Sequence, residues 1–163
     1  MKRFVGIKRR HLPTLAALLG VVLGLGISFC LSPDILGGAL PIPTFTKGKV
    51  FSTLWQTFGK EALPLCFAIA AAFITKHPLF ILIEVARRAF FLTFSSAYLA
   101  TLHKPLIFLL YAVLHLSALL AHIAAGIAAV SYDRKTGLFP ILYFVGLLFL
   151  LTVIRLLAFT LIL

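Results

Sequence analysis

Long uncharged runs alternate with short polar or proline-containing segments along the chain. The first run, Leu12–Leu31, has twenty residues without a charge, enough at about 1.5 Å per residue to cross a hydrocarbon core of roughly 30 Å. The hydrophobic pattern predicts five helical spans, at residues 12–31, 61–76, 79–100, 105–130 and 138–163. Backbone polar groups in lipid must be satisfied within their own segment, and these runs do not alternate between apolar and polar residues. The pattern therefore favours an all-α, polytopic transmembrane helical bundle over a β-barrel.

The longest connection, residues 32–60, is predicted to be an outer loop because prolines and glycines interrupt it. Its second half carries four large apolar side chains at helical spacing, which we call the aromatic face: Phe51, Leu54, Trp55 and Phe58. This spacing predicts a short amphipathic helix in the membrane interface, with Trp55 at headgroup depth. The aromatic face is the expected docking surface of the outer loop. The span that follows is apolar over only about fourteen residues, so we expect it to be tilted or re-entrant.

Lysine and arginine residues are unequally divided between the predicted loops. With a cytoplasmic N-terminus, the inner segments hold Lys2, Arg3, Lys8, Arg9, Arg10, Lys76, Arg134 and Lys135, and the outer segments hold Lys47, Lys49, Lys60 and Lys104. This bias predicts that the N-terminus is cytoplasmic and the C-terminus is outside. A basic start followed by an apolar run is also typical of a secretory signal peptide. The apolar run is long for a signal, so an uncleaved first helix is the expectation, with cleavage as the alternative.

Composition leads to the same class of protein. The 163 residues are 62% hydrophobic and 12% charged, with a mean hydropathy of +1.13, and a soluble domain of this size could not bury so much apolar surface. We expect one integral membrane domain over residues 1–163, with membrane lipid as a partner. The net charge of +11 lies in chain ends and short loops, where it orients spans, so nucleic acid is not an expected partner.

Three charged residues inside the third predicted span are the most informative candidates for a site. Glu84 lies three residues before Arg87 and four before Arg88, so both arginines can reach it on the helix surface. Charges at the bilayer centre cost about 2.5–3.5 kcal/mol each on insertion scales, which means that this cluster needs a reason. Either it neutralises itself, or the surplus arginine meets a partner subunit, a lipid headgroup or a polar cavity.

Two histidines in the fourth predicted span share a helix face. His115 and His122 are seven residues apart, or roughly 10.5 Å along the axis, too far to bind one metal ion from a straight helix. Small residues beside them favour a helix–helix contact in which the histidines hydrogen-bond across the interface. A proton relay is the alternative. Gly20 and Gly24 form a GxxxG pattern in the first span, which permits close helix approach.

The usual signatures of catalysis are missing from the sequence. It contains no phosphate-binding loop, no GxSxG, no HExxH and no CxxC pair, and only four acidic residues. We therefore predict no enzymatic activity, no cofactor and no metal. Cys30 and Cys66 are expected to be small, buried apolar side chains rather than a disulfide.

A basic N-terminus leads into the first predicted span, and the outer loop that follows ends in Phe51–Phe58. Two further stretches are PLFILIEVARRAFFLTFSSAYL, from Pro78 to Leu99, and VLHLSALLAHIAAGIAAVS, from Val113 to Ser131. In this order of segments the chain resembles the stage II sporulation protein M-like family of five-span bacterial membrane proteins. Within that family the sporulation protein acts in engulfment and holds cell-wall hydrolases at the septum. The resemblance implies a non-enzymatic scaffold in the bacterial cytoplasmic membrane, with membrane or cell-wall-remodelling proteins as partners.

Two functions from different classes remain. One is the membrane scaffold that anchors partner proteins. The other is a small transporter or permease subunit with a polar path near Arg87, Arg88, His115 and His122. Whether the chain forms homo-oligomers is open.

Overall fold

Five helices make up nearly all of the chain that the structure describes. The computed structural model describes residues 11–31, 50–75, 77–101, 105–131 and 139–162. The helices are α1 (Leu12–Cys30), α3 (Val50–Thr75), α4 (Leu79–Thr101), α5 (Pro105–Val130) and α6 (Phe139–Ile162). No strand occurs in these ranges, so the all-helical prediction is confirmed for them.

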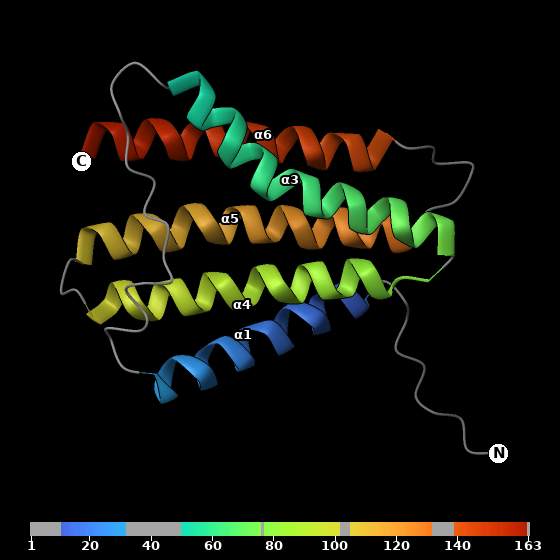
Figure 1. The fold of residues 1–163 in the computed structure, drawn as a ribbon, viewed down its shortest axis with the longest axis horizontal. Coiled ribbons are helices and arrows are strands. Elements are labelled where there is room, and N and C mark those ends of the chain that lie inside the picture. The colour runs from blue at the N-terminus through green and yellow to red at the C-terminus, as the bar shows by residue number, and fades with distance from the viewer. Residues whose placement is uncertain (1–10, 32–49, 76, 102–104, 132–138, 163) are drawn as a thin grey trace.

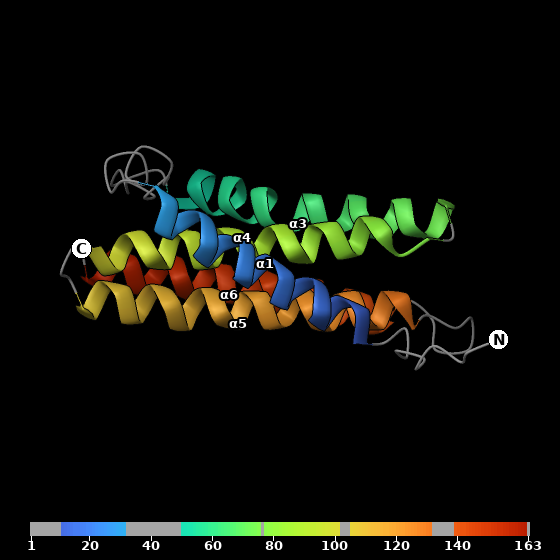
Figure 2. The ribbon, with the colours of Figure 1, turned by 90° about the horizontal axis from the view of Figure 1, so that it is seen from below.

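The helices lie side by side along one long axis (Figures 1 and 2). α4 contacts α1, α3 and α5, while α6 contacts α3 and α5. Successive helices run in opposite directions, and the start of α1 and the end of α6 lie at opposite ends of the bundle (Figure 1). By length and composition, α1, most of α3 (residues 52–75) and most of α5 (residues 111–130) can each cross a membrane. Large apolar side chains cover the outside of the bundle, as expected of a surface that faces lipid.

The core is built from small and branched apolar residues. Its most fully buried members are Leu65, Ile81, Val85, Ala89, Ala118, Ala125 and Leu148. Alanines dominate the centre because helices in lipid associate through close packing rather than through the hydrophobic effect. The same logic applies at the crossing of α1 and α4, where Gly20 faces Ala86 and Gly24 faces Phe90. The GxxxG pattern therefore marks a helix contact in the structure.

The segment before the second span differs from the prediction. Residues 50–60 are the first part of α3, continuous with the span, and not part of a loop that carries a separate interfacial helix. Between Val50 and Glu61 there is no proline, and the single Gly59 is tolerated within a helix. Pro64 lies inside α3 without ending it, although it removes the hydrogen bond to the carbonyl of Lys60. α3 changes direction along its length (Figure 1), as a proline inside a helix commonly causes. Its 26 residues extend about 39 Å, so the helix that contains the second predicted span is longer than the prediction of a short span.

Candidate functional site

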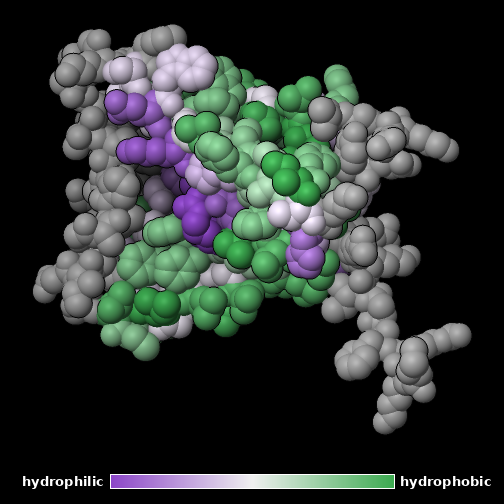
Figure 3. Space-filling view, turned by 45° about the vertical axis from the view of Figure 1, so that its right-hand side comes forward, coloured by the Kyte–Doolittle hydropathy of each residue, from purple (hydrophilic) through white to green (hydrophobic). Residues whose placement is uncertain are grey.

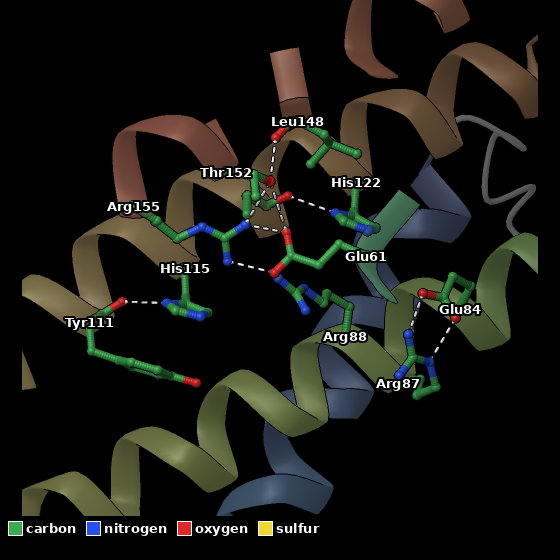
Figure 4. A network of polar contacts seen from close by, with 11 residues as sticks. Glu61, Glu84, Arg87, Arg88, Tyr111, His115, His122, Leu148, Thr152 and Arg155 are labelled. Atoms are coloured by element: carbon green, nitrogen blue, oxygen red, sulfur yellow. Dashed lines mark hydrogen bonds and ion pairs between the residues drawn. The ribbon is translucent and has the colours of Figure 1, made fainter. Parts of the chain in front are cut away.

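The charged interior of the bundle is centred on Glu61 of α3. Arg88 of α4 donates from Nη2 to Oε1 of Glu61 at 2.6 Å, and Arg155 of α6 donates from Nη1 to the same oxygen at 2.6 Å. Arg155 also donates from Nη2 to Oε2 of Glu61. Figure 4 shows the carboxylate between the two guanidinium groups. We call Glu61, Arg88, Thr152 and Arg155 the Glu61 network.

The Glu61 network is buried and joins three helices. Glu61 is 6% exposed, Arg155 is 4% exposed, and the side chain of Arg88 is 15% exposed. Two-point pairing of a guanidinium with a carboxylate is among the stronger and more directional contacts in proteins. Because the three partners come from α3, α4 and α6, the pairs fix these helices relative to one another. One carboxylate faces two guanidinium groups, so the network carries a surplus of one positive charge.

Thr152 supports the network from α6. It is fully buried, and its hydroxyl donates to the carbonyl of Leu148 at 2.8 Å. The same hydroxyl oxygen accepts a hydrogen bond of 3.2 Å from Nη2 of Arg155. Thr152 and Arg155 are three residues apart on one helix, which is why the hydroxyl can reach the guanidinium. The threonine thus helps to hold Arg155 in the orientation that Glu61 requires.

The charge cluster that the sequence predicts on α4 is divided between two sites. Arg87 donates from Nε and Nη2 to the two carboxylate oxygens of Glu84, both at 2.7 Å. Arg88 pairs instead with Glu61, because adjacent residues point about 100° apart on a helix. The side chain of Arg87 is 39% exposed, and its guanidinium lies 5.7 Å from the ring centroid of Phe91, within cation–π range. The Glu84–Arg87 pair therefore neutralises itself on α4, with Glu84 buried and Arg87 toward the outside of the bundle.

Each of the two histidines contacts a carbonyl of its own helix, and among the described residues neither ring hydrogen-bonds to another helix. Nδ1 of His115 lies 3.0 Å from the carbonyl oxygen of Tyr111, and Nδ1 of His122 lies 2.8 Å from that of Ala118. A carbonyl only accepts, so Nδ1 carries the proton in both rings and Nε2 of a neutral ring is an acceptor. The ring of His115 stacks on Tyr111 with centroids 3.8 Å apart. His122 is fully buried, and its Nε2 has no hydrogen-bond partner among the described residues.

The aromatic face packs partly against α6 and is partly exposed on the outside of the bundle. Trp55 and Phe58 lie 6.0 Å and 5.1 Å, between ring centroids, from Phe149. Trp55 is nevertheless 51% exposed, while Leu54 and Phe58 are half-buried. Phe51 belongs to α3, but its side chain lies outside the described part of the chain. Part of the predicted docking surface is thus used for packing within the bundle, and Trp55 is its most accessible described member.

The cysteines differ from the prediction in their burial. Cys30 and Cys66 are both free, and both are exposed on the outside of the bundle. In a bilayer an apolar thiol can face lipid, so the sequence did not require burial. Within the described ranges, no group of three or more histidine, cysteine or acidic side chains could hold a metal ion.

Glu61 and Arg155 are the functional residues that the sequence reasoning missed as partners. Glu61 is the first residue of the second predicted span and follows the predicted loop that ends at Lys60, and Arg155 is one cation in an apolar run. The available signal was that ionisable residues in separate spans tend to pair with each other inside the bundle.

Comparisons with protein-family models, curated proteins and solved structures give no match to this chain. The class of protein is therefore indicated by the fold alone. The described residues form an all-helical bundle in which three helices are long and apolar enough to cross a membrane, which is consistent with a membrane protein.

Proposed function

We propose that this chain is a non-enzymatic integral membrane scaffold that anchors partner proteins at the bacterial cytoplasmic membrane. The observation that carries the proposal is the pairing of the interior charges. Both acidic side chains in the described residues, Glu61 and Glu84, are bound by arginines of the same chain. Acidic groups held in this way are not available as general acids or bases, whereas they do stabilise a fixed helix arrangement.

The proposed topology has five crossings, with the N-terminus in the cytoplasm and the C-terminus outside. The alternating directions of the helices support it (Figure 1), as does the distribution of lysine and arginine between the loops. In this orientation the start of α3, with Trp55, lies toward the outer side. The resemblance to the stage II sporulation protein M-like family adds cell-wall-remodelling proteins of sporulation as candidate partners. The scaffold needs no cofactor.

Trp55 is the proposed contact with a partner. It is half exposed near the start of α3, next to Phe58 and Phe149, and half-exposed aromatic side chains with apolar neighbours are common anchors of protein interfaces. Leu63 on the same helix is similarly exposed, at 57% against 51% for Trp55. It therefore offers a matched control for loss of an exposed apolar side chain.

The test is co-purification of the tagged full-length chain from its native membranes in mild detergent. Trp55→Ser should remove a specific co-purifying protein, while Leu63→Ser should retain it and both variants should insert at wild-type levels. A single change at Trp55 is preferable to a double change with Phe58, because both rings pack against Phe149 and losing both would weaken the contact between α3 and α6 more. Retention of all partners by Trp55→Ser contradicts docking through this residue.

A transporter or permease subunit is the second candidate function. It is favoured by the surplus positive charge of the Glu61 network and by the hydrophilic area recessed in one largely apolar face of the molecule (Figure 3). The polar path in this case would include Arg87, Arg88, His115 and His122. Flux through liposomes that contain only the purified chain, lost in Arg88→Ala, would replace the scaffold by a transporter.

A further inference from the structure

The Glu61 network leaves several guanidinium N–H groups unused. Each arginine offers five donors, yet within the described residues Arg88 donates only from Nη2, to Glu61. Arg155 uses Nη1 and Nη2 for Glu61 and Thr152. Its Nε is buried and has no hydrogen-bond partner among the described residues. Buried donors are nearly always satisfied in native proteins, so the unpaired Nε of Arg155 points to an acceptor beside the Glu61 network.

The charges in the network call for an acceptor that is also negative. Glu61 compensates one of the two arginines, and the other described acid, Glu84, is already bound at both oxygens by Arg87. An uncompensated cation in a low-dielectric interior is strongly unfavourable. A water molecule could accept a hydrogen bond from Arg155, but it would leave the surplus charge in place. His122 does not help, because its Nε2 is an acceptor in the neutral ring and its protonation would add a further positive charge.

We propose that the Glu61 network binds one small monovalent inorganic anion through the guanidinium N–H groups that Glu61 does not use. One negative charge matches the surplus of one positive charge. The ion must be small because the surroundings are closed to solvent: Leu148 and Thr152 are fully buried and Arg155 is 4% exposed. Arg88, with 15% of its side chain exposed, gives the ion its access. This site is independent of partner anchoring, and it would stabilise the arrangement of α3, α4 and α6.

The experiment measures the thermal unfolding midpoint of the purified full-length chain in detergent. Sodium gluconate, whose anion is too large for the site, is replaced stepwise by sodium bromide at constant ionic strength. A ligand that binds only the folded state raises Tm with its concentration, so wild type should show a saturable rise in Tm with bromide. Equal Tm values in bromide and gluconate would overturn the proposal. So would a Tm that responds only to added anionic lipid, because the anion would then be a lipid headgroup.

Three variants locate the effect. Arg88→Gln leaves Glu61 paired with Arg155 alone and no surplus charge, so the bromide-dependent rise should be lost. Arg87→Gln is the matched control: it removes an arginine next in sequence, but one whose Nε and Nη2 are bound to Glu84, so the rise should remain. Glu61→Gln doubles the surplus charge and frees donors, so the bromide concentration at half-saturation should fall. If Arg88→Gln does not fold, Glu61→Gln decides, and a half-saturating concentration that is unchanged or higher overturns the proposal.

Discussion

The crossing of α1 and α4 gives the sharpest quantitative prediction. Gly20 lies so close to α4 that a Cβ atom there would overlap the carbonyl oxygen of Ala86 and lie 2.9 Å from the Cβ of Ala89. Carbon atoms pack at about 3.5–4.0 Å, so Gly20→Ala must move α1 away from α4 by about 1 Å. Overpacking of this kind costs about 1–3 kcal/mol. The gain in helix propensity, about 1 kcal/mol, offsets part of this cost.

Gly26 supplies the matched control in the same helix. A Cβ atom there would meet nothing within 4 Å, so Gly26→Ala should gain the propensity of about 1 kcal/mol and lose no packing. The two variants should therefore differ by about 1–3 kcal/mol in free energy of unfolding, with Gly20→Ala the less stable. Gly24→Ala should resemble Gly20→Ala, because its Cβ would lie 2.8 Å from the carbonyl oxygen of Phe90. Unfolding by SDS in mixed micelles measures the difference, and equal stability of the Gly20 and Gly26 variants would refute the close contact.

Three further predictions follow from the site and the topology. Glu61→Ala should destabilise the chain by about 3–5 kcal/mol in the same assay, because it leaves the buried Arg155 and the partly buried Arg88 without their carboxylate. Glu84→Ala should cost clearly less, because Arg87 is 39% exposed and can reach a polar surface. The reverse order would show that Glu61 is not the centre of the network. His122→Leu should leave Tm unchanged or raise it, because it removes a buried Nε2 that has no hydrogen-bond partner in the described part of the chain. A large fall in Tm would mean that this nitrogen is bound. Reporter fusions after Thr75 and after Leu163 should report opposite sides of the membrane, cytoplasmic and outer respectively; a shared side would rule out three crossings by α4, α5 and α6.

The helices were the easier part to predict from the sequence. Uncharged runs bounded by prolines, glycines and basic residues predict the positions of α1 and α5 closely. Such helices depend on the length and hydropathy of their own segment, which the sequence contains. The start of α3 differs from the prediction because Gly59 and Lys60 are typical of the end of a polar loop, which led to a predicted span that begins only at Glu61. In the fold Lys60 is exposed, while Glu61 is buried between arginines of two other helices, so tertiary pairing allows the helix to continue.

The site could be predicted only where its contacts are local. Glu84 and Arg87 are three residues apart and pair as helical spacing requires. Arg88 and Arg155 lie 27 and 94 residues from Glu61 in the sequence. The spacing of residues within one helix cannot predict pairs between helices that are so far apart in the chain. The contacts of the histidines are also local, but the sequence did not predict them. The sequence predicts hydrogen bonds from both histidines across a helix contact, but the carbonyl that each ring uses belongs to its own helix and could not be chosen from residue types alone.

The most direct test of the scaffold is photo-crosslinking from position 55 in living cells. A photoreactive amino acid replaces Trp55 in one chain and Leu63 in another, both about equally exposed on α3. The account predicts a discrete protein adduct from position 55 and none from position 63, where the side chain should face lipid. Absence of a protein adduct from both positions would contradict the claim that this chain anchors a partner through the start of α3.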